Sequence, residues 1–208
     1  MTNLQLVKEL SYKLHEINHD NPKRTIEELL AHQLHCSPLE IYNYPTPDIK
    51  IFNSLVDRLL KFEPLQYITG EVNFYGMELK CDQRALIPRP ETEILVNECI
   101  RSSKWNNPNI SVADVGTGSG CIAISLACAK SAASIDAIDI SNDALALAKE
   151  NAQRYNLKNI NFYKKDLLKN SNTNTYDIII SNPPYISTEN WKSLSASVNN
   201  FEPRLALD

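Results

Sequence analysis

The sequence Asn182-Pro183-Pro184-Tyr185 is the most specific motif in the chain, and it follows a short apolar run. Two consecutive prolines can end a strand, because neither donates a ladder hydrogen bond, but that leaves the asparagine and the tyrosine unexplained. An amide or exocyclic amino nitrogen is a poor nucleophile, because its lone pair is delocalised. The Asn182 side-chain oxygen and the Pro183 carbonyl could accept its two hydrogens while Tyr185 stacks on the flat group. The motif therefore indicates group transfer to a planar nitrogen, a reaction in which positioning supplies much of the rate.

A second motif is a loop that holds three of the chain's five glycines, Gly116-Thr117-Gly118-Ser119-Gly120. Glycine used so sparingly and then clustered suggests a backbone that must come close to a ligand. The spacing departs from the G-x-G-x-x-G loop that binds the pyrophosphate of dinucleotides. Asp114, two residues before the first glycine, also suits a cationic ligand better than a phosphate.

Two further carboxylates follow the next two predicted strands. Asp139 ends the second strand, where a carboxylate can accept hydrogen bonds from both hydroxyls of a ribose. Asp166 follows the third, where it could accept from an adenine amino group, with Leu167 against the ring. For either carboxylate taken alone, a solvated charge at the end of a strand is the simpler explanation. Together with Asp114 and the glycine loop, they match S-adenosylmethionine, which carries a ribose, an adenine, an ammonium and a sulfonium but no phosphate.

The elements that must position these residues form an α/β chain with three predicted parts. Residues 1–68 show the periodicity of amphipathic helices, with one helix starting after Ser37 and another at Thr46-Pro47. Residues 69–86 form a β-hairpin linker around Tyr75-Gly76, and residues 87–208 form the catalytic domain. There, strands alternate with helices, which predicts a Rossmann-like parallel sheet with its ligands at the carboxyl ends of the strands. The predicted strands are 110–115, 134–140, 161–163 and 176–181, and the predicted helices are 91–103, 121–132 and 143–155.

Composition excludes several classes of protein. The chain of 208 residues is 43% hydrophobic and 22% charged, and it has no apolar run near the ~18 residues that span a bilayer, which argues against a membrane protein. The net charge of -4 provides no basic footprint for nucleic acid. Five cysteines without a C-x-x-C pair indicate reduced thiols in a cytoplasmic protein. All four histidines lie in the first 35 residues, so we expect no histidine triad and no metal near the glycine loop.

The motifs together resemble the class I S-adenosylmethionine-dependent methyltransferases that act on planar nitrogens. The stretches 66–70 (Gln-Tyr-Ile-Thr-Gly) and 86–93 (Leu-Ile-Pro-Arg-Pro-Glu-Thr-Glu), with the helical N-terminal part, resemble more narrowly the release-factor-specific protein-(glutamine-N5) methyltransferases. This resemblance implies methylation of the glutamine side-chain amide in the Gly-Gly-Gln loop of class 1 peptide-chain release factors. It implies that Gly116 to Gly120, Asp139, Leu167 and Asn182 hold the cofactor and that Asn182 to Tyr185 hold the glutamine. The helical part would help to dock the release factor.

The resemblance also implies a seven-stranded sheet, whereas the strand count here is four. Residues 201–208 match the start of a stretch after which family members continue through three more strands, so we expect a domain that is incomplete at its C-terminus. The fourth strand would then be an uncovered edge. Two alternatives remain open. One is a nucleic-acid amino methyltransferase acting on adenine N6 or guanine N2, which would share the tetrapeptide, and the other is an inactive fragment. Arg89 and its neighbours are as readily a proline-fixed helix start as a functional segment.

Overall fold

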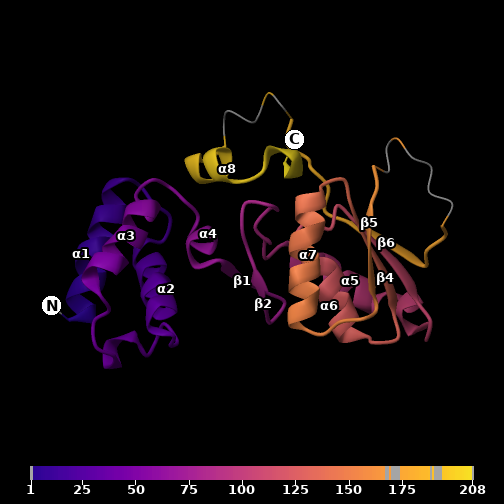
Figure 1. Ribbon diagram of the computed structural model, residues 1–208, viewed down its shortest axis with the longest axis horizontal. Coiled ribbons are helices and arrows are strands. Elements are labelled where there is room, and N and C mark those ends of the chain that lie inside the picture. Colours follow the sequence, from indigo (N-terminus) through magenta and orange to yellow (C-terminus); the bar gives the residue numbers. More distant parts are fainter. Residues whose placement is uncertain (1, 167–168, 170–173, 188, 190–193, 208) are drawn as a thin grey trace. The chain divides into compact units, whose positions relative to one another are not determined.

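A computed structural model describes residues 2–166, 169, 174–187, 189 and 194–207 of the chain. The chain forms two compact units, and each is described by itself below (Figure 1). The first comprises Met1–Thr69 with Ser195–Phe201, and the second comprises Gly70–Leu194 with Glu202–Asp208. The predicted division instead treated the hairpin as a linker and assigned the residues after 194 to the catalytic part. None of the described helices is long and apolar enough to cross a membrane.

The first unit is helical, as the periodicity of its apolar residues predicts. Its elements are α1 (Asn3–Glu16), α2 (Pro22–Leu34), the 3₁₀ turn η1 (Ile41–Asn43), α3 (Ile49–Leu59), α4 (Leu65–Thr69) and α8 (Ala196–Phe201). A capping box between Thr2 and Gln5 starts α1. Fully buried side chains from α1, α2 and α3 meet in one core, among them Leu14, Ile26, Leu29 and Phe52.

Two helix starts in this unit differ from the prediction. The Glu40 side chain accepts hydrogen bonds from the Ser37 backbone and hydroxyl, yet only the turn η1 follows. The reason is Pro45, which favours extended backbone in the residue before it and so ends the turn at Tyr44. The next helix, α3, begins two residues later than Thr46-Pro47 suggested, because the Asp48 side chain caps it.

The second unit begins with the predicted hairpin. Its antiparallel strands are β1 (Glu71–Phe74) and β2 (Met77–Lys80). The turn between them falls at Tyr75-Gly76, as predicted, and both residues have positive φ, +51° and +73°. Positive φ at both central residues is the conformation that matches the twist of two-residue hairpins.

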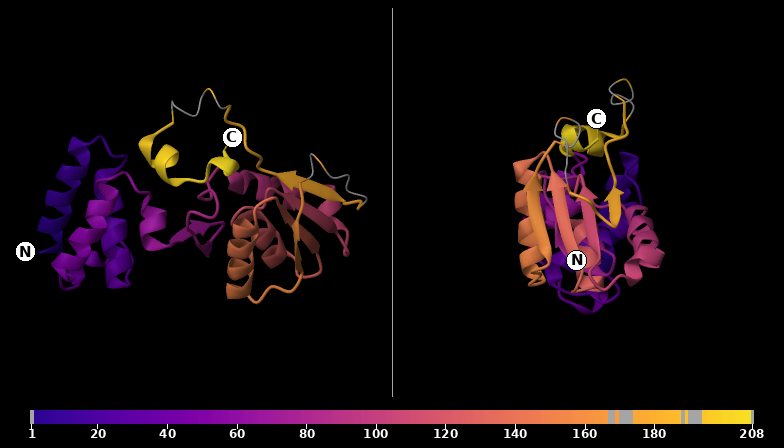
Figure 2. Two further views of the ribbon diagram at one scale, coloured as in Figure 1. Left: turned by 45° about the horizontal axis from the view of Figure 1, so that its top comes forward. Right: turned by 90° about the vertical axis from the view of Figure 1, so that its right-hand side faces the viewer.

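A four-stranded parallel sheet follows, which confirms the predicted fold class. The elements are α5 (Thr92–Arg101), η2 (Ser103–Asn106), β3 (Ser111–Val115), α6 (Cys121–Ala129), β4 (Ser134–Asp139), α7 (Asn142–Arg154), β5 (Ile160–Lys164), β6 (Ile178–Ser181) and η4 (Arg204–Ala206). The strand order is β5-β4-β3-β6, with all neighbours parallel (Figure 2). Among the described strands, β6 is therefore an edge, and its Ile179 is 68% exposed.

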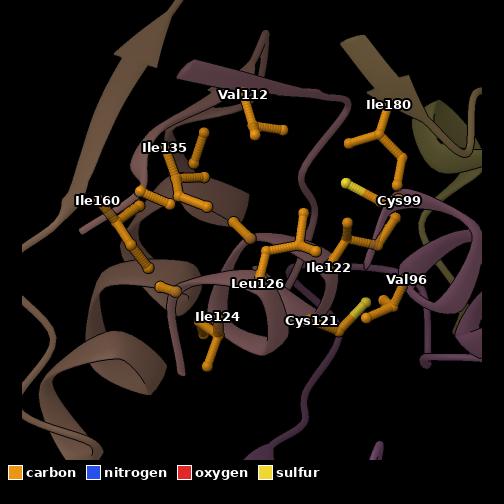
Figure 3. Packing of buried hydrophobic residues seen from close by; sticks show 14 of the residues in the cluster. Val96, Cys99, Val112, Cys121, Ile122, Ile124, Leu126, Ile135, Ile160 and Ile180 are labelled. Carbon is orange, nitrogen blue, oxygen red and sulfur yellow. The ribbon is translucent and has the colours of Figure 1, made fainter. Parts of the chain in front are cut away.

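Helix α6 forms the centre of the core of this unit. Its residues from Cys121 to Ala127 are buried on every side of the helix, because the sheet, α5 and α7 surround it. Ile122 and Leu126 lie among Val112 and Ile135 of the sheet and Cys99 of α5 (Figure 3). A helix buried all round must be apolar all round, which explains why its sequence is Cys-Ile-Ala-Ile-Ser-Leu-Ala. The packing fixes the start of α6, where the glycine loop ends.

Candidate active site

The glycine loop joins the end of β3 to the start of α6, and the neighbouring strand fixes its shape. The backbone nitrogens of Gly116 and Thr117 both donate to the Ile138 carbonyl of β4, at 2.8 and 3.0 Å. Gly116, Gly118 and Gly120 have φ values of +74°, +56° and +83°. Side chains with a Cβ rarely adopt that conformation, so the backbone itself favours glycine at all three positions.

Two of these glycines have different surroundings. A Cβ at Gly116 would meet no atom within 4 Å, whereas one at Gly120 would lie 3.0 Å from Ala148 Cβ and from Ile124 Cδ1. Gly120 therefore lets α6 and α7 approach each other closely. Gly116 faces open space at the carboxyl end of the sheet, which is what a backbone loop needs if a ligand is to lie against it.

Asp114 lies fully buried behind this loop. Its Oδ2 accepts hydrogen bonds from Thr117 Oγ1 at 2.7 Å and from the Ala123 backbone at 3.1 Å. Its Oδ1 has no hydrogen-bond partner among the described residues. Burial above all, and to a smaller extent the nearby charge of Asp139, raise the pKa of this carboxyl to about 6 against the opposing effect of the two hydrogen bonds. Asp114 thus holds the loop through Thr117 and leaves one acceptor unsatisfied, a combination that favours a cationic ligand.

Asp139 ends β4 beside the loop. Its Oδ2 accepts from the Gly118 backbone and its Oδ1 from the Ser141 backbone, both at 2.9 Å. These bonds fix the plane of the carboxylate, and each oxygen keeps a lone pair that could accept a hydroxyl. Asp166 follows β5, the strand next to β4, and pairs with Lys169 at 3.3 Å. Leu167, the predicted contact of the adenine ring, lies outside the described residues.

Asn182 follows the end of β6 on the other side of β3. Val115 and Ser181 are paired in register, and Ser181 Oγ donates to the Val115 carbonyl at 2.7 Å, so the tetrapeptide begins beside the glycine loop. The Asn182 Nδ2 donates to Thr92 Oγ1 of α5 at 3.2 Å. Pro183, Pro184 and Tyr185 are exposed, Tyr185 by 78%, so the tyrosine ring offers a face for stacking.

The sheet therefore gathers the predicted residues of the site at the carboxyl ends of its strands. Asp114, Asp139 and Asn182 stand at or near the carboxyl ends of three adjacent strands, and Asp166 follows the fourth. The donors and acceptors suit S-adenosylmethionine: an open glycine cradle, a fixed carboxylate for a ribose and a buried carboxylate for a cation. The roles of the individual residues stay predictions.

Three residues that support the site were not singled out from the sequence. Thr92 contacts Asn182, and Glu202 pairs with Arg89. Asn151 of α7 is fully buried and joins the hairpin to the loop, because its side chain bonds both backbone groups of Lys80 and the Ser119 carbonyl. An asparagine on the apolar face of a helix is the one signal that could have indicated Asn151, since buried polar groups need partners. Thr92 and Glu202 lie in the stretches 86–93 and 201–208 that carry the family resemblance, but neither residue type indicates its partner.

We expect the parent protein to lose stability between about pH 4 and pH 6 and the Asp114→Asn variant to lack this loss, because asparagine does not titrate. The folded-state pKa of about 6 lies above the usual value of 3.8, so the folded chain binds this proton more tightly than the unfolded chain. The contribution of Asp114 to stability is therefore fully present below about pH 4 and is lost as the pH rises to about 6, by roughly 3 kcal/mol. Denaturant unfolding of both proteins between about pH 4 and pH 8 measures the difference. A difference that stays constant across this range would contradict the assignment.

Comparisons with known proteins cover both units. Residues 91–199 match the methyltransferase small domain family, and residues 5–70 match the PrmC N-terminal domain family. The release factor glutamine methyltransferase of Chlorobaculum tepidum is 38% identical over 90% of this chain and 69% of its own length. That of Streptococcus pneumoniae is 48% identical over 74% of this chain and 53% of its own length. Among solved structures, Trm5b from Pyrococcus abyssi superposes with a TM-score of 0.46 at 24% identity, over 58% of this chain and 35% of that one.

The chain spans only part of the length of the relatives that it matches. The matches cover between 45% and 69% of the release factor glutamine methyltransferases compared, including that of Fusobacterium nucleatum at the lower end. The identity nevertheless extends over nearly the whole of this chain, through the helical unit and through the sheet with its glycine loop. The chain belongs to the release factor glutamine methyltransferase family, whose members are S-adenosylmethionine-dependent.

Proposed function

We propose that the protein transfers a methyl group from S-adenosylmethionine to the side-chain amide nitrogen, N5, of a glutamine. The substrate would be the glutamine of the Gly-Gly-Gln motif in class 1 peptide-chain release factors, and the result would be a modulation of translation termination. One observation carries the proposal beyond family membership. The Asn182 amide stands beside the glycine loop with its donor side occupied by Thr92, so that its oxygen is the group available to a substrate N–H.

The cofactor would lie along the carboxyl edge of the sheet and supply the methyl group. The loop from Gly116 to Gly120 would take its methionine part, with the charge of Asp114 behind the loop favouring the cationic groups. Asp139, whose carboxylate plane is fixed by two backbone hydrogen bonds, would accept from the ribose hydroxyls. Asp166 would accept from the adenine amino group.

The tetrapeptide would hold the glutamine. Asn182 Oδ1 and the Pro183 carbonyl would accept the two hydrogens of the amide, and Tyr185 would stack on its plane. Both hydrogens would then be fixed, and the nitrogen lone pair would point out of the amide plane toward the methyl carbon. As the new N–C bond forms, the bond from the methyl group to the sulfonium sulfur would break, and the nitrogen would lose one of its two hydrogens as a proton to solvent. Neither a histidine nor a metal takes part in this scheme, because holding the nucleophile in line supplies the rate.

The release factor would dock through the helical unit. Leu4, Tyr12, Leu39 and Ile51 of this unit are large apolar side chains that are each more than half exposed. Contiguous exposed apolar patches mark surfaces that bind another protein, so these side chains are the first to replace in a test of docking. The location that this partner implies is the cytoplasm, in line with five cysteines that are all free thiols.

The direct test offers the protein two kinds of substrate with methyl-labelled cofactor. We expect label in a purified class 1 release factor and none in the same factor with its Gly-Gly-Gln glutamine replaced by asparagine. Equal amounts of DNA and RNA serve as the competing substrates. Label that enters nucleic acid and not the release factor would overturn the proposal in favour of an amino methyltransferase for bases.

A further inference from the structure

Among the residues that the structure describes, Thr92 is the one that hydrogen-bonds the Asn182 side chain, and it comes from a distant part of the chain. It is the first residue of α5, stands 90 positions before Asn182 and is 6% exposed. Its Oγ1 accepts the Nδ2 hydrogen of Asn182 at 3.2 Å. Threonine often caps a helix when it precedes the first helical residue. In α5 that position is held by Glu91, which makes no side-chain cap, and Thr92 is the first helical residue itself.

This contact matters because an asparagine amide has two unlike ends. Its Nδ2 only donates hydrogen bonds and its Oδ1 only accepts them. A substrate amide nitrogen presents N–H groups, so it needs Oδ1. Were the side chain turned over, Nδ2 would face the substrate N–H, donor against donor, and the substrate hydrogen would lose its acceptor. The orientation of Asn182 therefore decides whether the site can hold a planar nitrogen.

The position of Thr92 is itself fixed by the segment before it. The Thr92 backbone donates to the Arg89 carbonyl at 3.0 Å, and prolines on both sides of Arg89 restrict the chain. The Arg89 guanidinium pairs with Glu202, whose side chain is 1% exposed. The same carboxylate accepts from the Ile87 backbone at 3.2 Å. Two unlike donors thus hold Glu202 in one geometry, and together they hold the segment 87–92 against residue 202.

We propose that Thr92 is a positioning residue that holds the Asn182 side chain by its Nδ2 and so keeps Oδ1 turned toward the substrate. The ion pair between Arg89 and Glu202 keeps the Thr92 segment in place for this purpose. The inference rests on the proposed transfer to an amide nitrogen, because only that function requires an acceptor at Asn182. It gives the proline–arginine segment a role in the site without any contact of its own to the reacting atoms.

The test compares three variants of the full chain. Thr92→Val keeps the shape of the side chain and removes the hydroxyl, and we expect kcat to fall by about 3- to 10-fold, the value of one hydrogen bond, with the KM for the cofactor unchanged. Thr92→Ser keeps the hydroxyl and should retain kcat within about twofold. The control is Ser125→Ala, which removes another buried hydroxyl of the same unit, one that donates to the Cys121 carbonyl at 2.7 Å, and it should leave kcat unchanged.

A second readout separates this inference from the proposed function. In protein with nitrogen-15-labelled asparagine, we expect the Nδ2 hydrogen of Asn182 that Thr92 accepts to exchange slowly with solvent, a protection that Thr92→Val removes and Thr92→Ser keeps. Parent protein that shows this pattern without methylating a release factor would overturn the function and leave the contact standing. Thr92→Val with the kcat and the amide signals of the parent would overturn the positioning role.

Discussion

Replacing Asn182 by alanine is expected to lower kcat for glutamine methylation by about 10²- to 10³-fold while changing cofactor affinity only modestly. The variant removes the acceptor for one substrate hydrogen, and with it the constraint that directs the lone pair of the nitrogen at the methyl carbon. The cofactor cradle stays in place, because Gly116 and Thr117 are held by the Ile138 carbonyl and Gly118 by Asp139. Single-turnover kinetics with labelled cofactor, combined with calorimetry of S-adenosylhomocysteine binding, separate the two effects.

A matched control for this variant is Asn161→Ala. Asn161 lies on β5 of the same sheet and donates to Asp136 Oδ1 at 3.0 Å, while Tyr176 donates to the other oxygen of that carboxylate. Removing Asn161 therefore costs one hydrogen bond of the sheet without touching the glycine loop or the tetrapeptide. Turnover of Asn161→Ala should match the parent. If Asn182→Ala also turned over like the parent, the role given to Asn182 would be wrong.

The secondary structure was predictable wherever a short-range pattern determines it. The alternation of strands and helices after residue 110 placed every described strand of the sheet to within about two residues at each end. The turn at Tyr75-Gly76 was predictable for the same reason, since its signal lies in the two residues themselves. The helix expected after Ser37 was wrong, although the Glu40 side chain does bond the Ser37 backbone. A local start signal cannot outweigh Pro45, which favours extended backbone at Tyr44 and so ends the turn.

The candidate site was predictable as a set of residues but not as a set of contacts. The motifs identified Asp114, Asp139 and Asn182, because each stands next to the end of a strand whose apolar run is visible in the sequence. Their partners are different. Thr92 meets Asn182 across 90 positions and Glu202 meets Arg89 across 113, and no periodicity encodes contacts of that range. Complete burial of Asp114 was likewise hidden, because it depends on how α6 packs over the end of β3.

A second prediction with a large effect concerns Gly120 and Gly116, two glycines of the loop that cannot be told apart from the sequence. Gly120→Ala is expected to lower the free energy of unfolding by about 3–5 kcal/mol, the range of overpacked cores combined with an unfavourable φ. The added Cβ would lie 3.0 Å from Ala148 Cβ and 3.2 Å from Ala148 Cα, and the backbone of α7 cannot give way as a flexible side chain can. Denaturant unfolding of the variant measures this loss.

Gly116→Ala provides the matched comparison, because the same substitution at a similar φ meets no atom within 4 Å. Only the backbone strain remains, about 1–2 kcal/mol. The new methyl group, however, projects into the open space in which the cofactor is proposed to lie, so S-adenosylhomocysteine should bind much more weakly to a variant that is still folded. The two glycines would then separate cleanly, Gly120 acting on stability through the contact between α6 and α7 and Gly116 on binding through the open face of the loop. Equal stability losses at both positions, with unchanged binding at Gly116, would show instead that the whole loop serves only the fold.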